Sequence, residues 1–409
     1  MSLITKFTLP NGVRVLVEPS LTVKSVSIGL WCHTGSRHEF DNEAGITHLI
    51  EHMLFKGTKK RTAKEIAEAI EGRGGMLNAF TDKESTCYYC RMLSDDVAVG
   101  IDVLSDMMLN SLFDQEELER EEQVVLEEIR RGEDEPGDHV HEVHLEQRWG
   151  SHPLGKPIIG TAESVSSFMR DDLITYMDRR YRGENILLSV AGNVDPAAVV
   201  ALAESKLGSI PSGTENGQPA RPLGKPGMHY VERPVEQVHF CIGGDGLSFY
   251  DDDIYTLKVL DAALGGSMSS RLFQEIRERR GLAYAVGSYS LSYGAGGAFT
   301  VYGGTSRKNW EQVQELTAVE FGKVMSDGLM ADELERTKRN LIGSIVLALE
   351  STSSKMMRQA RNELNFQREI PIEETTSKIE AVSGNQVIEL ARRLLDPATL
   401  STTAIGPAC

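Results

Sequence analysis

The sequence is poor in cysteine, and its few cysteines are odd in number. The chain of 409 residues has five, namely Cys32, Cys87, Cys90, Cys241 and Cys409. A disulfide-stabilised secreted protein normally shows a denser, even-numbered set. We therefore expect free thiols and a reducing compartment.

Long apolar runs are also missing. No segment reaches the roughly 18 consecutive apolar residues that a membrane-spanning helix requires. The first residues, MSLITKFTLPNGVRVLVEP, are typical of a strand, a Pro-Asn-Gly turn and a second strand, and not of a secretory signal peptide. We expect no membrane segment and a cytoplasmic location.

Positive charge is in deficit. The sequence has 43 Lys and Arg against 60 Asp and Glu, a formal net charge of −17 and a pI near 5.1. This balance argues against general binding to nucleic acid or to an anionic membrane, and it is compatible with basic partners. The 40% hydrophobic and 25% charged residues are typical of a globular protein.

The length and one composition break predict two domains. The segment PSGTENGQPARPLGKPG, residues 211–227, has four prolines and four glycines and no hydrophobic period. Each half on either side begins with an alternating strand, a loop and an apolar helix, which indicates an ancient duplication. We predict an α+β fold with homologous domains at 1–210 and 230–409, joined by a linker at 211–229. Each domain is expected to be a mainly antiparallel sheet packed with helices.

The apolar helix of the first half carries an unusual polar face. In THLIEHMLFKG, residues 47–57, His48, Glu51 and His52 stand at i, i+3 and i+4 and span about 100° of helix surface. Burying three polar side chains is costly unless a hydrogen-bond network or a metal satisfies them. The corresponding helix of the second half has no such triplet.

A later helix adds two inward glutamates. DQEELEREEQVVLEEIRR has an apolar stripe formed by Leu118, Val125 and Ile129. At about 100° per residue, Glu121 and Glu128 fall inside this stripe, while Glu119 and Glu127 point away from it. Carboxylates on a core-facing stripe require a partner.

Two histidines and one inward glutamate are the ligands of many catalytic zinc sites, which leave a fourth position to water. Glu51, on the same face as His48 and His52, is then placed to take a proton from that water. The order His-x-x-Glu-His is the inverted form of the commoner zinc-protease motif. The alternative is a core histidine bonded to a carboxylate, and the inward glutamates favour the metal.

On these motifs the chain resembles the pitrilysin/insulinase family of metallopeptidases, in particular short forms such as the mitochondrial processing peptidase beta subunit and its bacterial homologues. The likeness extends over nearly the whole chain. It implies one Zn2+ per chain, held by His48, His52 and Glu128, which follows His52 by 76 positions. It further implies Glu121 as a carboxylate behind the ligands and Glu51 as general base.

The resemblance also assigns residues outside the zinc motif. SSRLFQEIRERRGLAYAVGS matches the family's arginine–tyrosine motif, which implies that Tyr284 stabilises the oxyanion and that Arg277 holds a substrate carbonyl. The alternative for this charged run is a solvated helix face. LNAFTDKESTCYY resembles the edge strand that pairs with an extended peptide. Asn78 and Ala79 are expected to meet the substrate backbone, and Phe80 faces either the cleft or the core.

Two acidic residues carry a specificity hypothesis. In processing-peptidase relatives, acidic residues ten and fourteen positions after the glutamate ligand hold an arginine near the cleavage site. Counted from Glu128, the resemblance implies this role for Asp138 and Glu142. They stand four apart on one helix face, a spacing suited to a guanidinium. The alternative is ordinary surface acid on an acidic protein.

The sequence therefore predicts a zinc-dependent endopeptidase that acts on peptides or unfolded segments in a clam-like cleft between two domains. Because full-length relatives enclose substrates with four such domains, the resemblance implies a homodimer, or a heterodimer with a second half-size subunit. No nucleic acid and no membrane are expected as partners. The alternatives are a non-catalytic assembly subunit of the same family and a module that only captures peptides.

Overall fold

The computed structural model describes residues 4–214, 217 and 220–408, in two compact units. Unit 1 consists of Met1–Ile129, Pro157–Gly217 and Leu347–Pro371, and unit 2 consists of Arg130–Lys156, Gln218–Val346 and Ile372–Cys409. Part of the predicted linker, residues 215–216 and 218–219, lies outside the described residues. Within the described ranges, no helix is both long and apolar enough to cross a bilayer.

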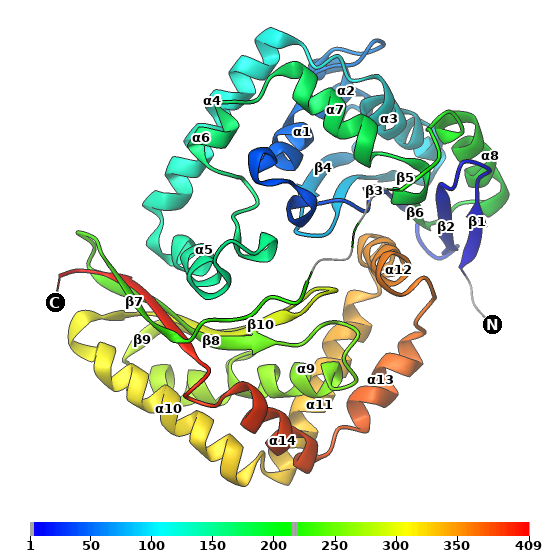
Figure 1. Ribbon diagram of the computed structural model, residues 1–409. Coiled ribbons are helices and arrows are strands. Elements are labelled where there is room, and N and C mark those ends of the chain that lie inside the picture. Colours follow the sequence, from blue (N-terminus) through cyan, green and yellow to red (C-terminus); the bar gives the residue numbers. More distant parts are fainter. Residues whose placement is uncertain (1–3, 215–216, 218–219, 409) are drawn as a thin grey trace. The chain divides into compact units, whose positions relative to one another are not determined.

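Unit 1 is built on a six-stranded sheet in the order β1-β2-β6-β3-β5-β4 (Figure 1). Of its pairs only β2 and β6 run parallel. Strand β4 forms one edge of the sheet and β1 the other. The strands are β1 Thr5–Thr8, β2 Arg14–Pro19, β3 Ser25–Cys32, β4 Met76–Thr81, β5 Thr86–Leu93 and β6 Ile186–Gly192.

One face of this sheet packs against helices from the first half of the chain. The main core of unit 1 lies between the sheet and α1, α3 and α8, and it includes Ile28 and Leu30 of β3 with Leu49 and Met53 of α1. The helices are α1 Ile46–Leu54, α2 Ala63–Glu71, α3 Val97–Asn110, α4 Gln115–Asp134, α6 Ala162–Val165, α7 Arg170–Arg180 and α8 Pro196–Leu207.

The other face is covered by α12 (Thr352–Phe366), which comes from the second half of the chain (Figure 1). Met356 and Ala360 of α12 are fully buried against Trp31 of β3. Glu363, 3% exposed, forms ion pairs with Lys6 of β1 and Arg14 of β2. Packing and charge therefore both attach this helix to unit 1.

Unit 2 has a five-stranded sheet in the order β7-β11-β8-β10-β9, in which only β7 and β11 run parallel. One face packs against helices of the second half, and α5 from the first half covers the other. The strands are β7 Gly227–Glu232, β8 Gln237–Gly246, β9 Ala283–Ser292, β10 Gly297–Ser306 and β11 Ser401–Gly406. The helices are α5 Pro136–Trp149, α9 Ile254–Leu264, α10 Trp310–Asp327, α11 Ala331–Ala348, α13 Ile372–Glu380 and α14 Gly384–Leu394.

The two sheets share one topology. Across the sheet, the order is β2-β6-β3-β5-β4 in unit 1 and β7-β11-β8-β10-β9 in unit 2. In both, the first of these strands along the chain pairs in parallel with the last, and the second, fourth and third follow. This agreement supports the predicted duplication, and the α+β fold with two helix-packed, mainly antiparallel sheets is confirmed.

The compact units differ from the predicted division at 210 and 230, because each half of the chain contributes a helix to the other unit. Arg130–Lys156, with α5, belongs to unit 2, and Leu347–Pro371, with α12, belongs to unit 1. The physical reason is that each sheet has two apolar faces, and the helices of its own half cover only one. Composition reveals a polar linker but not this exchange.

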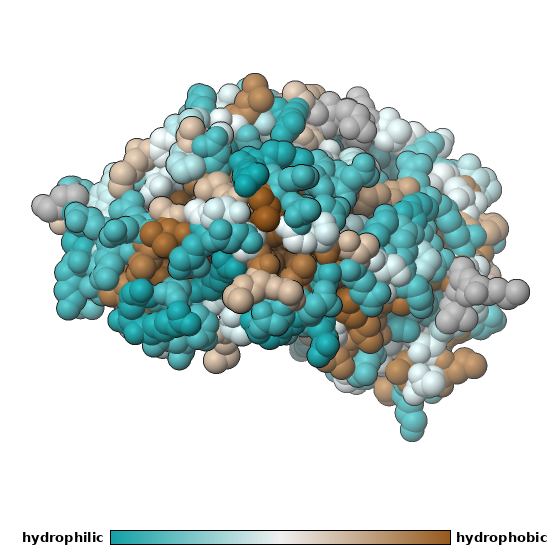
Figure 2. Space-filling model, turned by 90° about the horizontal axis from the view of Figure 1, so that it is seen from below, coloured by the Kyte–Doolittle hydropathy of each residue, from teal (hydrophilic) through white to brown (hydrophobic). Residues whose placement is uncertain are grey.

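The face of the protein in Figure 2 is mainly hydrophilic, with brown apolar patches scattered among charged and polar residues. A surface of this kind agrees with the 25% charged residues of the sequence.

Candidate metal centre

Helix α1 has its N-terminus fixed by Glu39. Both carboxylate oxygens of Glu39 accept backbone hydrogen bonds, Oε2 from Gly45 and Oε1 from Thr47, each at 2.9 Å. Gly45 has φ +92°, and a Cβ there would lie 2.5 Å from the carbonyl oxygen of Ile159, so this helix entry requires glycine. Burial raises the pKa of Glu39 to about 7 despite the two backbone donors.

The residues of α1 divide between two faces, as their spacing predicts. Its apolar residues are buried in the core of unit 1, whereas His48, Glu51 and His52 are only partly buried. The three polar side chains therefore share the face of α1 that is turned away from the core.

His48, His52 and Glu128 lie together on this face. One ligand atom from each lies within 4.8 Å of the other two. Oε2 of Glu128 is 3.9 Å from Nε2 of His48 and 3.7 Å from Nε2 of His52. These separations are too long for hydrogen bonds. They are slightly wider than the edge of about 3.3 Å expected between ligands of tetrahedral zinc.

The donor set suits zinc in its chemistry as well. Desolvation by burial, together with the nearby His52, lowers the pKa of His48 to about 4. The imidazole of His48 is therefore neutral near pH 7, which is the form that binds metals. Two imidazole nitrogens and one carboxylate are the combination found in His₂Glu zinc sites.

His52 is oriented by Glu121, which comes from α4. The Nδ1 of His52 lies 3.0 Å from Oε2 of Glu121, and the Nζ of Lys56 lies 2.5 Å from Oε1. Although burial by itself raises the pKa of Glu121, the contacts with His52 and Lys56 lower it below its usual value. An ionised Glu121 fixes the ring of His52 so that its Nε2 is directed to Glu128.

The structure distinguishes the two glutamates of α4. Glu121 is 5% exposed, in agreement with its predicted inward position. The side chain of Glu128 is 50% exposed, so its predicted place on a buried stripe is only partly right. It stands beyond Leu126, the last buried residue of α4, where the helix leaves the core. Its carboxylate is therefore open to solvent while it faces both histidines.

Glu51 is not part of the three-residue cluster, but it lies beside it on the same helix face. The hydroxyl of Thr81, at the end of β4, donates a hydrogen bond of 2.5 Å to Oε2 of Glu51. Burial raises the pKa of Glu51 above its usual value. A half-buried carboxylate next to a metal-binding set is suited to accept and release a proton.

Strand β4 has one face directed to α1 and another directed to α12. Leu77 and Ala79 pack against the main core of unit 1. Phe80 points to the opposite side, where its ring meets Trp31 edge-on at 5.5 Å between centroids. The sequence left open whether Phe80 faces the cleft or the core, and the structure shows it packed against the core. Asn78 is exposed, and its Oδ1 accepts a hydrogen bond from the backbone N–H of Ala79.

Arg277 and Tyr284 lie next to each other in unit 2. A π-helical turn over Phe273–Glu278 carries Arg277, and β9 starts just before Tyr284. The guanidinium carbon of Arg277 is 4.6 Å from the ring centre of Phe273 and 4.9 Å from that of Tyr284. Tyr284 is 80% exposed. The structure thus places an arginine and an accessible phenol side by side.

Asp138 and Glu142 both lie on the exposed side of α5. The histidines of this helix form no second metal centre, since the described residues contain only the one group of three or more potential ligands. His144 is fully buried instead, with Nδ1 3.1 Å from Oγ1 of Thr403.

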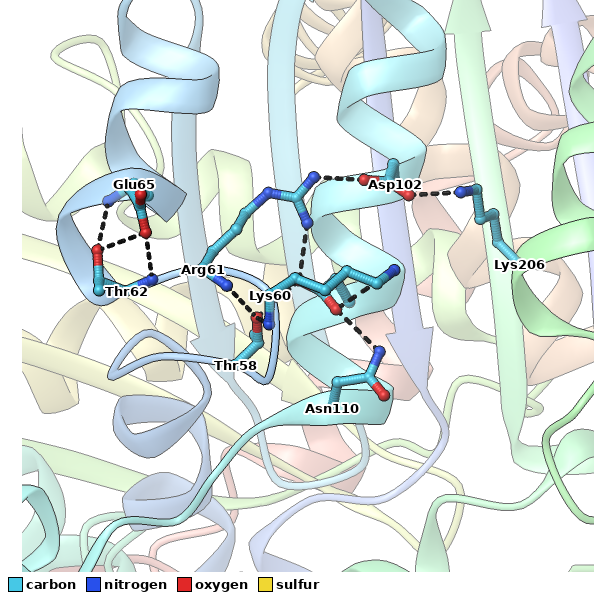
Figure 3. A network of polar contacts seen from close by, with 9 residues as sticks. Thr58, Lys60, Arg61, Thr62, Glu65, Asp102, Asn110 and Lys206 are labelled. Atoms are coloured by element: carbon cyan, nitrogen blue, oxygen red, sulfur yellow. Dashed lines mark hydrogen bonds and ion pairs between the residues drawn. The ribbon is translucent and has the colours of Figure 1, made fainter.

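A network of charged side chains around the buried Asp106 ties the segment after α1 to α3 and α8 (Figure 3). Asp106 of α3, 2% exposed, accepts hydrogen bonds from Thr58 at 2.7 Å, Arg61 at 2.7 Å and Asn110 at 2.8 Å. Arg61 also pairs with Asp102, which binds Lys206 of α8.

The same region links α1 to the start of α4. The hydroxyl of Ser111 donates to the carbonyl of Met53, and the backbone N–H of Leu112 donates to the carbonyl of Gly57. The network therefore holds the end of the histidine helix against the chain that leads to Glu121 and Glu128.

Sequence reasoning missed four residues around the centre: Glu39, Lys56, Thr81 and Asp106. Two of them had a detectable signal. Lys56 follows His52 by four residues, which is the spacing of one helix face, and Thr81 follows Ala79 by two and shares its strand face. Glu39 and Asp106 act through contacts between elements, for which the sequence holds no local signal.

Comparisons with known proteins show which families the two halves of the chain match. Residues 14–162 match the family Insulinase (Peptidase family M16), and residues 167–341 match the Peptidase M16 inactive domain. The first match contains all three members of the metal cluster, and the second contains Arg277 and Tyr284.

Several curated relatives are similar over almost their whole length. A Bacillus subtilis protein named uncharacterized zinc protease YmxG is 43% identical over 396 residues, 96% of each chain. A Mycobacterium tuberculosis protein named uncharacterized zinc protease Rv2782c is 40% identical over 405 residues, 98% of this chain and 92% of the relative.

Two solved structures have the same fold at 21% identity. The peptidase M16 inactive domain from Pseudomonas fluorescens matches with a TM-score of 0.91, over 99% of this chain and 98% of that one. A protease from Helicobacter pylori matches with a TM-score of 0.92, over 99% of each chain.

Proposed function

Because the chain belongs to the insulinase family of peptidases, peptidase family M16, we propose that it is a zinc-dependent endopeptidase that cleaves peptides or unfolded protein segments. One observation carries the proposal. His48, His52 and Glu128 offer a ligand set for zinc, and Glu51 stands beside that set without belonging to it. A ligand set with an adjacent, independently held carboxylate is the arrangement that metal-assisted hydrolysis needs.

In this proposal His48, His52 and Glu128 hold one Zn2+ per chain. Zinc, when bound, lowers the pKa of water and polarises the scissile carbonyl. Glu51 accepts the proton of the attacking water and then delivers it to the leaving amine. Glu121, held by Lys56, fixes the tautomer and direction of His52.

The substrate would be recognised mainly through its backbone. Strand β4 is the edge of its sheet, so a peptide can pair with it, and Asn78 and Ala79 are the positions proposed to meet the substrate. Main-chain pairing favours extended peptides and unfolded segments over folded proteins. We assign oxyanion stabilisation to Tyr284 and the hold on a substrate carbonyl to Arg277, on the family resemblance.

Three finer points belong to the same proposal. An arginine near the cleavage site is held by Asp138 and Glu142. The protein acts as a homodimer, or as a heterodimer with a second half-size subunit. It works in the cytoplasm. The four cysteines among the described residues are free and buried, which supports a reducing compartment.

The competing function is that of a non-catalytic assembly subunit. Family members that serve as scaffolds have lost catalytic residues, whereas His48, Glu51, His52 and Glu128 are all in place here. The intact set favours the peptidase.

The test is hydrolysis of internally quenched peptides whose two ends are blocked, so that only endopeptidase cleavage gives a signal. The protein is stripped of metal with a chelator and then titrated with Zn2+. We expect no activity in the stripped protein and full activity near one equivalent per chain. Stoichiometric zinc binding without cleavage, across a diverse peptide library, would favour the scaffold.

A further inference from the structure

The hydroxyl of Thr81 connects the edge strand to the proposed general base. Thr81 is the last residue of β4, on the same strand face as Leu77 and Ala79. Those two side chains pack against the core, whereas Thr81 donates a hydrogen bond of 2.5 Å to Oε2 of Glu51. The contact joins residues 30 positions apart in the sequence.

The end of β4 is held firmly. Thr81 pairs with Thr86 in the β4–β5 register, and the hydroxyl of Thr86, fully buried, donates to the carbonyl of Thr34. The tip of the hairpin is fixed by two further backbone bonds, from Ser36 to Asp82 at 3.2 Å and from Arg37 to Lys83 at 2.9 Å. The Thr81 hydroxyl therefore projects from an anchored backbone.

Threonine suits this task because its branched Cβ leaves few side-chain rotamers, so the hydroxyl direction is set by the strand. Glutamate, in contrast, has three rotatable bonds, and a general base works only when its acceptor oxygen has the correct direction. A hydrogen bond to one oxygen defines the orientation of the other.

We propose that Thr81 is a positioning residue for Glu51. The Thr81 hydroxyl binds Oε2 of Glu51, so that Oε1 is the oxygen that accepts the proton. This inference rests on the proposed peptidase function. Because β4 is also the strand proposed to pair with the peptide, substrate and base are aligned by one element of the structure.

The test compares two substitutions of Thr81. Thr81→Val keeps the shape of the side chain and removes the hydroxyl, whereas Thr81→Ser keeps the hydroxyl. We expect Thr81→Val to lower kcat about ten- to a hundredfold, with KM within about twofold and zinc stoichiometry unchanged. Thr81→Ser should retain kcat within about threefold. Thr8→Val, on the exposed strand β1 at the opposite edge of the same sheet, is the matched control.

A binding measurement separates base positioning from substrate binding. In a Glu51→Gln background, which should not turn over, the affinity for a fluorescent peptide is measured with and without Thr81→Val. Equal affinities are expected if Thr81 acts through Glu51. A weaker affinity in the double variant would show instead that Thr81 contributes to substrate binding.

Several results would overturn the inference: an unchanged kcat in Thr81→Val, an equal loss in Thr81→Ser, or loss of zinc in either variant. Failure of the function itself looks different. If wild type and Glu51→Gln are equally inactive on every peptide, the peptidase proposal falls, and the role of Thr81 falls with it. If Glu51→Gln abolishes turnover and Thr81→Val does not affect it, only the Thr81 proposal fails.

Discussion

The Nδ1 of His52 lies 3.0 Å from Oε2 of Glu121, a buried carboxylate on a different helix. The other oxygen of Glu121 pairs with Lys56, which follows His52 by four residues and lies just past the end of α1. Lys56 and Glu121 thus orient the proposed ligand His52 without being ligands themselves. Zinc affinity should therefore depend on residues that do not contact the metal.

We therefore expect Glu121→Gln to weaken zinc binding about 10- to 100-fold, because an amide is a poorer acceptor for the His52 N–H. Lys56→Met should weaken it less, since the carboxylate remains. Zinc affinity is measured by competition with a chromophoric chelator. Lys59→Met, nearby but without a contact to Glu121, is the control. Equal affinities in all four proteins would remove Glu121 from the centre.

Glu51→Gln should keep both the fold and the zinc, because glutamine is nearly isosteric and Glu51 lies outside the ligand cluster. Turnover should be lost, since an amide cannot accept the proton of the attacking water. Zinc content by elemental analysis and peptide cleavage are measured on the same samples. Loss of metal together with activity would make Glu51 a ligand, and full activity would exclude it as the base.

The ligand on α4 can be tested by neighbouring substitutions. Glu128→Gln should lose zinc on dialysis, because its carboxylate faces both histidines at 3.7 and 3.9 Å. Glu127→Gln should retain zinc, since its side chain points about 100° away around the helix. The opposite outcome would shift the ligand by one residue.

The charge network of Figure 3 predicts acid-sensitive stability. Burial alone raises the pKa of Asp106, but hydrogen bonds from Thr58, Asn110 and Arg61 lower it below its usual value. A lowered pKa means that the ionised form stabilises the fold above the unfolded pKa of about 3.9, and that this stabilisation is lost as the pH falls further.

Asp106→Asn should accordingly lower the free energy of unfolding by about 1.5–3 kcal/mol at pH 7, because it removes the charged acceptor of the hydrogen bonds from Thr58 and Arg61. The difference from wild type should shrink as the pH is lowered from 4 toward 2. Denaturant unfolding over this range is the measurement. Asp102→Asn, at a more exposed position of the same network, should have a smaller effect. A difference that is constant with pH would mean that Asp106 does not titrate in this window.

If Asp138 and Glu142 bind an arginine, peptides with arginine near the cleavage site should be cut about ten- to a hundredfold faster than matched alanine peptides. The double variant with Asn and Gln should lose this preference and keep its activity on neutral peptides. Because both side chains are exposed, added salt should also reduce the effect. A peptide library analysed by mass spectrometry is the readout. A preference that survives the double substitution would assign it to other residues.

The sequence determined the parts of this protein that depend on local geometry. The spacing of His48, Glu51 and His52 fixes their common face, because an α-helix turns by about 100° per residue. The same rule identified Glu121 as an inward side chain, whereas the direction of the Phe80 side chain was left open between cleft and core. The order of the strands in each sheet was not predicted, because strand pairing joins segments that lie far apart in the chain.

The tertiary structure decided what depends on contacts between distant segments. It placed the Glu128 carboxylate near the Nε2 atoms of both histidines and the Glu121 carboxylate at Nδ1 of His52. The sequence predicted only that both glutamates lie on the same side of α4. It directed Phe80 to the core and Thr81 to Glu51, and it exchanged α5 and α12 between the two halves. Periodicity says which side of an element is buried. Which partner covers that side is set by the packing of the whole chain, since apolar burial is not directional.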